Sequence, residues 1–164
     1  MSLLGRLFPK QVDNRFEGLR PALWLLGLLI FVKLAMSLNS ILNTAAIAGG
    51  ADGIPLASFG PAAARQVLLL FALVALGHLT VTLIALTALI RWRALVPFIY
   101  LVMLGEHLAR RFIASSYAAP GARMTDVAWY VNYGLLTLVT LGLLLSLIPA
   151  RGWSARSLNV KEAQ

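Results

Sequence analysis

Four long runs of apolar residues alternate with short polar segments along the chain. Each run reaches the approximately 20 residues that a helix needs to cross a hydrocarbon core of about 30 Å. Because a chain in lipid must satisfy its own backbone hydrogen bonds, we expect each run to be helical. The pattern therefore predicts an all-α, polytopic membrane protein with four transmembrane helices in an antiparallel bundle. The predicted spans are residues 21–45, 66–90, 94–114 and 127–149.

The composition supports the membrane class. The chain has 164 residues, of which 60% are hydrophobic and 12% are charged, whereas soluble domains average about 45–50% apolar and about 25% charged residues. Little chain remains outside the four runs, so we expect a single domain over residues 1–164. The absence of cysteine excludes disulfides, thiolate metal sites and thiol–disulfide exchange.

The net charge of +8 is distributed unevenly between the two sides of the predicted bundle. An excess of Lys and Arg marks the cytoplasmic side, so the distribution predicts cytoplasmic N and C termini in a bacterial-type cell inner membrane. The charge then reflects topology and attraction to anionic lipids, and we expect no nucleic-acid binding. Nine basic residues fall on the predicted inner side (Arg6, Lys10, Arg15, Arg20, Arg91, Arg93, Arg151, Arg156 and Lys161) and four on the outer side (Arg65, Arg110, Arg111 and Arg123).

The segments that connect the spans differ in length. Residues 49–64 are rich in Gly and Pro turn formers, so we expect an outer loop without a regular element, able to fold back onto the bundle mouth. Residues 91–93 predict a tight inner connection. The first 20 residues fit either a short amphipathic anchor on the inner leaflet or a frayed terminus. Asp52 and Asp126 are interpreted as a turn residue and a helix N-cap.

Two stripes of small or polar residues predict contacts between helices. Small residues let helices approach closely in lipid, where no hydrophobic force drives their association. One stripe lies on the second predicted span and one on the fourth. The stripe on the second span contains Ala75, His78, Thr82 and Ala85, and the stripe on the fourth span contains Gly134, Gly142 and Ser146.

Three ionisable residues occur at one predicted depth inside the spans. Lys33 follows Arg20 by thirteen residues, His78 precedes Arg91 by thirteen, and Glu106 follows Arg93 by thirteen. At about 1.5 Å per helical residue, all three lie roughly 20 Å from the same face. Charge at this depth is costly, so it usually marks a function or a specific partner. The candidate site is thus an intramembrane polar layer of Lys33, His78, Glu106, His107 and Arg110.

Two interpretations of Glu106 remain open at this point. In one, Arg110, four residues later on the same helix, satisfies Glu106, while Arg110 and Arg111 extend to the outer surface. In the other, Glu106 pairs with Lys33 across the bundle, because Lys33 has no acid within one turn of its own helix. Lys33 shares a polar helical face with Ser37 and Ser40, which we expect to point into the bundle or toward another subunit.

His78 and His107 are the only histidines, and their predicted depths agree to about one residue. Two neutral imidazoles in a four-helix bundle can ligate a haem b iron, with Arg110 and Arg111 near its propionates. The alternative is that His78 is hydrogen-bonded inside the bundle and that His107 lies at a helix interface. The sequence predicts no other metal site and no cofactor beyond this haem alternative.

The chain carries no catalytic triad pattern and no phosphate-binding glycine loop, so we expect no enzyme activity. The favoured function is that of a non-catalytic accessory or structural subunit of a membrane complex. Its expected partners are the lipid bilayer and other membrane subunits or further copies of itself. The alternatives are a small proton-coupled transporter that uses the Lys33, His78 and Glu106 layer, or a haem-binding membrane protein.

Overall fold

The computed structural model describes residues 3–117 and 125–150, and every regular element in these ranges is helical. The Pro120-Gly121 turn, the polar tail from Arg151, and Trp153 lie outside the described residues. The elements, in chain order, are α1 (Leu3–Leu7), α2 (Pro21–Leu42), α3 (Thr44–Ala46), the π-helical turn η1 (Ile47–Ala51), the 3-10 turn η2 (Leu56–Ser58), α4 (Pro61–Arg91), the 3-10 turn η3 (Arg93–Leu95), α5 (Val96–Tyr117) and α6 (Asp126–Leu147).

Three helices of the described chain, α2, α4 and α6, are long and apolar enough to cross a membrane. The sequence predicted four such spans. The fourth candidate, α5, has 22 residues, as many as α2 and α6, but it carries Glu106, Arg110 and Arg111, which lower its hydropathy. The all-helical fold class is therefore confirmed, and three helices have the length and hydropathy to cross a membrane.

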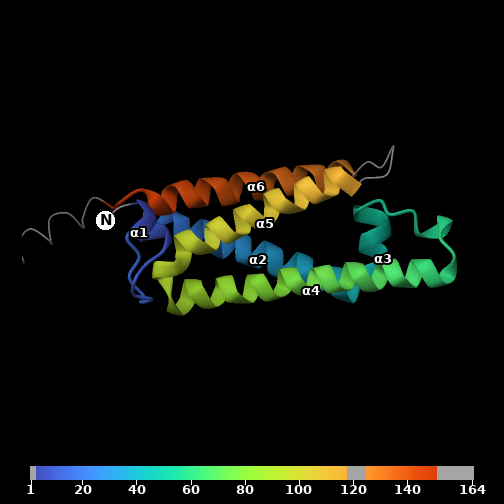
Figure 1. Cartoon of the computed structure of the whole chain (residues 1–164), viewed down its shortest axis with the longest axis horizontal. Coiled ribbons are helices and arrows are strands. Elements are labelled where there is room, and N and C mark those ends of the chain that lie inside the picture. Colours follow the sequence, from blue (N-terminus) through green and yellow to red (C-terminus); the bar gives the residue numbers. More distant parts are fainter. Residues whose placement is uncertain (1–2, 118–124, 151–164) are drawn as a thin grey trace, which may run out of the picture.

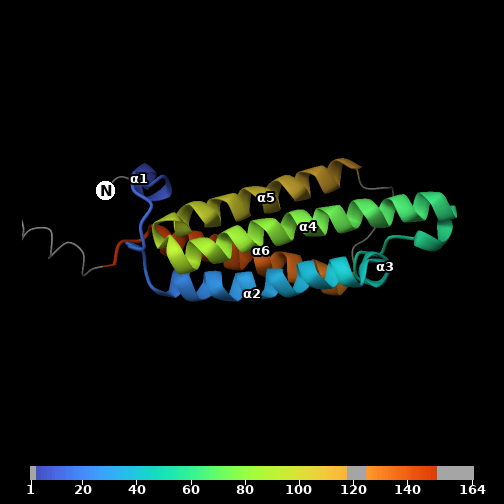
Figure 2. The same cartoon turned by 90° about the horizontal axis from the view of Figure 1, so that it is seen from below.

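The four long helices run side by side along the length of the molecule (Figures 1 and 2). Helix α2 packs against α4 and α6, and α5 packs against the same two helices. Helix α1, the α4–α5 connection and the last residues of α6 gather at one end, which we call the proximal end. The α3 and η1 turns and the start of α4 lie at the opposite, distal end.

The distal segments differ from the sequence prediction. Helix α2 ends at Leu42 because Asn43 leaves the helical region, with φ −120° and ψ 40°. The chain then forms α3 and η1, and α4 begins at Pro61 rather than at residue 66, with proline where its missing N–H does no harm. The prediction that residues 49–64 hold no regular element is therefore wrong. The expectation that glycine forms a turn in this segment is correct at Gly53, which has a φ of 69°.

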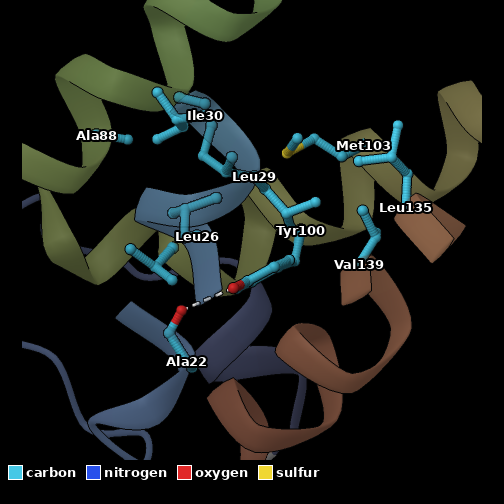
Figure 3. Packing of buried hydrophobic residues seen from close by; sticks show 12 residues of the cluster. Ala22, Leu26, Leu29, Ile30, Ala88, Tyr100, Met103, Leu135 and Val139 are labelled. Atoms are coloured by element: carbon cyan, nitrogen blue, oxygen red, sulfur yellow. Dashed lines mark hydrogen bonds between the residues drawn. The ribbon is translucent and has the colours of Figure 1, made fainter. Parts of the chain in front are cut away.

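The proximal half is an apolar core. Leu26, Leu29, Met103 and Val139 are fully buried there around Tyr100 (Figure 3). The Tyr100 hydroxyl donates a 2.7 Å hydrogen bond to the Ala22 carbonyl oxygen, which joins α5 to the first turn of α2. This bond satisfies the only polar atom of the tyrosine side chain, so the ring is buried without an unpaired group.

The small-residue stripes are partly confirmed. Ala75, Thr82 and Ala85 of α4 are buried. On α6, a Cβ atom added at Gly142 would collide with the Tyr100 ring, so glycine is what allows this contact. The prediction is wrong for Gly134, which is exposed and has no atom within 4 Å of an added Cβ.

The segment from α1 to Arg20 crosses the proximal end and is bonded to it. The Leu19 N–H donates to the Leu145 carbonyl, and the Ala94 N–H donates to the Asp13 carbonyl. The Arg6 side chain donates to the Leu147 carbonyl. These bonds exclude the frayed-terminus interpretation for the described residues. Leu3 and Leu4 remain 64% and 69% exposed, as expected of an amphipathic anchor.

Candidate functional site

Glu106 is the centre of a charged cluster at the middle of the four long helices. Its Oε2 atom lies 3.1 Å from Lys33 Nζ of α2 and accepts a hydrogen bond from it. Its Oε1 atom lies 3.1 Å from His78 Nε2 of α4. The three residues that the sequence placed at one depth are therefore in contact, and the interpretation that Lys33 and Glu106 pair across the helices is confirmed.

Arg110 extends the cluster to α6. Its Nε atom is 3.7 Å from Glu106 Oε1, so the alternative pairing within α5 is also present, at a longer distance than the pairing with Lys33. Its Nη2 atom donates a 3.1 Å hydrogen bond to Asn132 Oδ1. The charged cluster, defined as Lys33, His78, Glu106 and Arg110, thus links all four long helices.

Arg110 and Arg111, which one interpretation extends to the outer surface, both also make specific contacts with α6. Arg111 donates to the Tyr133 hydroxyl, and its guanidinium lies 4.2 Å from the centroid of the Tyr133 ring. A guanidinium over an aromatic face is a favourable cation–π contact. Asn132 and Tyr133 were not among the predicted site residues, although both are polar residues in a mostly apolar run.

Both histidines present their Nε2 atoms to protein groups. His78 Nε2 faces Glu106, and His107 Nε2 lies 3.4 Å from Arg110 Nη2. His107 is 1% exposed, and its Nδ1 atom has no hydrogen-bond partner among the described residues. Both Nε2 atoms face protein groups in this arrangement, so a haem iron between the two rings would have to replace these contacts. The described residues also contain no group of three or more metal-ligating side chains.

A cavity of about 540 Å³ occupies the distal half of the molecule, beside the charged cluster. This volume is within the range of about 300–1,000 Å³ that is typical of small-molecule sites. Lys33, Ser37 and Ser40 of α2 line it, which confirms that the polar face of the first span points inward. The other polar or charged residues on its wall are Asp52, His78, His107, Arg110, Arg111, Asn132 and Tyr133.

The turn η1 forms the distal wall of this cavity. Ile47, Ala51 and Asp52 contribute to the lining, and the Thr125 hydroxyl ties the turn to α6 through a 2.7 Å hydrogen bond to the Ala51 carbonyl. Burial raises the pKa of the Asp52 carboxyl above its usual range, and the positive charge of Arg110 offsets part of this rise. The loop over residues 49–64 therefore folds back onto the helices, as predicted.

The Thr125 hydroxyl also shows that the interpretation of Asp126 as the helix N-cap is wrong. Thr125, rather than Asp126, caps α6, because its Oγ1 atom accepts a 3.3 Å hydrogen bond from the Ala128 N–H. Asp126 lies in the first turn, where a carboxylate is favourable beside the helix N-terminus.

Comparison with known proteins gives no family assignment: no protein family, curated protein or solved structure matches this chain. The residues and their geometry are therefore the basis for any statement about function.

Proposed function

We propose that the chain is a non-catalytic accessory protein of a bacterial-type inner membrane that holds a small ligand in the distal cavity. The observation that carries this proposal is the cavity of about 540 Å³ lined by residues from all four long helices. The cavity is partly open to its surroundings, so a ligand can enter it. A space of this size beside a charged cluster is what a ligand site requires.

The proposed topology has four spans, with both termini in the cytoplasm. Helix α5 packs against α4 and α6, so if those two helices cross the bilayer, α5 lies at the same depth. Its charges are compatible with this position because they face Lys33, His78 and Asn132. The proximal end, which carries the larger number of basic residues, would face the cytoplasm.

Single cysteines test this topology, since the chain has none of its own. Ser58→Cys at the distal end should react with a membrane-impermeant maleimide added to intact cells, and Asp13→Cys at the proximal end should react only after lysis. A fluorescent reporter fused to the C-terminus should remain active in the cytoplasm. A reporter found outside the cytoplasm would mean an odd number of spans and would contradict the four-span topology.

Native mass spectrometry tests ligand binding. The protein is extracted gently from the membrane, and its intact mass is recorded with whatever remains bound. Ser40 lines the cavity, so Ser40→Phe should reduce its volume and lower the bound fraction. Leu38→Phe is the matched control, because Leu38 is 42% exposed and does not line the cavity. Equal occupancy in both variants would place the ligand elsewhere.

A second candidate function is proton-coupled transport, which the contact of Glu106 with Lys33 and His78 favours. A carboxylate between a lysine and a histidine can exchange protons as a substrate binds and leaves. In reconstituted vesicles, Glu106→Gln should then abolish uptake driven by a pH gradient, while Asp126→Asn should not. Uptake that is unchanged in Glu106→Gln would remove Glu106 from the mechanism. A Soret absorption band in the same preparations would revive the haem alternative.

A further inference from the structure

The cavity has more positive than negative charge around it. Lys33, Arg110 and Arg111 on its wall are cationic. Two carboxylates oppose them: Asp52 on the wall, and Glu106, which is in contact with Lys33 and Arg110. These three cations and two carboxylates together leave one positive charge without a partner among them. Such a charge in a low-dielectric site favours a single anion.

The hydrogen-bonding groups on the wall are mostly donors. Arginine and lysine have donors only. Lys33, Arg110 and Arg111 on the wall therefore present N–H groups and no acceptor to a bound molecule. A ligand with charged acceptor oxygens is the chemical match for such a wall.

The rest of the lining is apolar. Phe71 and Val74 of α4 and Leu135 of α6 form part of the wall. An inorganic anion would leave this surface without a partner, whereas an alkyl chain would cover it. The lining therefore matches a molecule with one oxyanion and one apolar tail.

From this combination we propose that the cavity binds one monoanionic amphiphile, a carboxylate or phosphate ester with an apolar tail. The oxyanion accepts a hydrogen bond from Arg110, and the tail packs on Phe71, Val74 and Leu135. This inference rests on the proposed ligand-binding function and names the chemical class of the ligand. A fatty acid and a phosphate-bearing lipid share this chemistry, and the experiment separates them.

The first measurement is the identity of the molecule retained in native mass spectrometry. We expect an acidic amphiphile at one copy per chain, and its fragment masses distinguish a carboxylate from a phosphate. Arg110→Gln should lower the bound fraction about tenfold, because it removes a charged donor. Arg65→Gln, which loses the same charge from an exposed position on α4 outside the cavity, should leave it unchanged.

A second measurement needs no change to the charged cluster. Trp129 lines the cavity, so with Trp24, Trp92 and Trp153 replaced by Phe, the remaining fluorescence reports on this site. The probes are a terminally brominated dodecanoate and its uncharged methyl ester, titrated into protein in nanodiscs of zwitterionic lipid. Bromine quenches tryptophan on contact. We expect the anion to quench at about tenfold lower concentration than the ester, and dodecyl phosphate to compete with it if the natural head group is a phosphate.

The outcomes separate this inference from the proposed function. Equal quenching by the anion and the ester, or a neutral lipid retained equally by wild type and Arg110→Gln, would overturn the anionic class. If that neutral lipid were lost in Ser40→Phe, ligand binding in the cavity would stand. An empty wild-type protein that neither probe quenches would overturn both. Retention of the acidic amphiphile by Arg110→Lys, which keeps the charge, would further support the inference.

Discussion

The apolar core around Tyr100 and the distal cavity differ in how the four long helices fill the space between them. A second pocket of about 560 Å³ lies at the proximal end, but it is lined mainly by the segment that precedes α2 and not by the core. In the proximal half, apolar side chains pack around Tyr100, and even one added methyl group at Gly142 would collide with this ring. In the distal half, a cavity of about 540 Å³ remains, and charged or polar side chains line much of it. The charged cluster around Glu106 lies at the boundary between these two regions.

This difference matches the proposed function, which needs a rigid support beside a ligand site. Apolar packing in the proximal half fixes the positions of the helices without help from charged residues. The residues of the distal half can therefore be polar or charged even where they do not stabilise the fold. The cluster at the boundary is the exception, because its charges must remain paired wherever they are buried. Substitutions in the two halves should therefore have different consequences, and the cluster should be the most sensitive.

The largest effect is expected at the boundary. Glu106→Gln removes the one acidic partner of Lys33, which is 8% exposed, and should lower the free energy of unfolding by about 3–5 kcal/mol. Lys33→Met should cost less, because Glu106 keeps His78 and Arg110 beside it. Reversible unfolding in mixed micelles measures both, and Asp126→Asn at an exposed position is the control.

The double variant of Lys33 and Glu106 tests whether this loss is due to an uncompensated charge. Lys33→Met combined with Glu106→Gln leaves no buried lysine, so it should be more stable than Glu106→Gln alone. Strictly additive losses would show that the two side chains do not interact and that the boundary is no more sensitive than its surroundings.

The second prediction compares two glycines on α6, one from each half. Gly142→Ala places a methyl group against the Tyr100 ring and should destabilise the protein by about 1–3 kcal/mol. Gly134→Ala meets no atom within 4 Å and should be neutral or slightly stabilising, because alanine favours the helix. The same unfolding assay applies. Equal losses at both positions would mean that the distal half is packed as tightly as the proximal half.

The sequence predicts the helices well because their signal is strong and local. Runs of some 20 apolar residues locate the spans, and the common thirteen-residue spacing from flanking arginines correctly brings Lys33, His78 and Glu106 to one level. The depth of a residue along a helix depends only on the rise per residue, so it can be calculated from residue numbers alone. The contact between Lys33 and Glu106 follows from depth together with the need to pair a buried charge.

The predictions that were wrong or incomplete depend on how the helices are rotated about their axes and on contacts between residues far apart in the sequence. Gly134 and Gly142 share a stripe in the sequence, but only Gly142 has a large neighbour, and that neighbour is Tyr100 from another helix. The hydrogen bond of Arg110 to Asn132 joins residues from two helices whose relative rotation no local pattern fixes. In residues 49–64, Gly and Pro correctly indicated turns, but packing of the loop on the helices also stabilises short helical turns there.

The third prediction concerns the polar contact inside the apolar half. Tyr100→Phe keeps the ring and removes the hydroxyl that donates to the Ala22 carbonyl, so it should cost about 0.5–1.5 kcal/mol. Tyr130→Phe is the matched control, since Tyr130 is 69% exposed. A loss in Tyr100→Phe no greater than in the control would mean that the proximal half is held by apolar packing alone.

The smallest effect is expected at the distal wall, where Thr125 caps α6 and also holds η1 through Ala51. Thr125→Ala removes both bonds and should lower the free energy of unfolding by about 0.5–1 kcal/mol, whereas Thr125→Ser keeps the hydroxyl and should match the wild type. Hydrogen exchange should show the local consequence, with faster exchange in residues 47–51 of Thr125→Ala only. Since this turn is one wall of the cavity, the same variant should also retain less ligand. Loss of ligand without faster exchange in η1 would instead mean that Thr125 acts on the site through α6. The shape of the distal half would then be set by its helices, as it is in the proximal half.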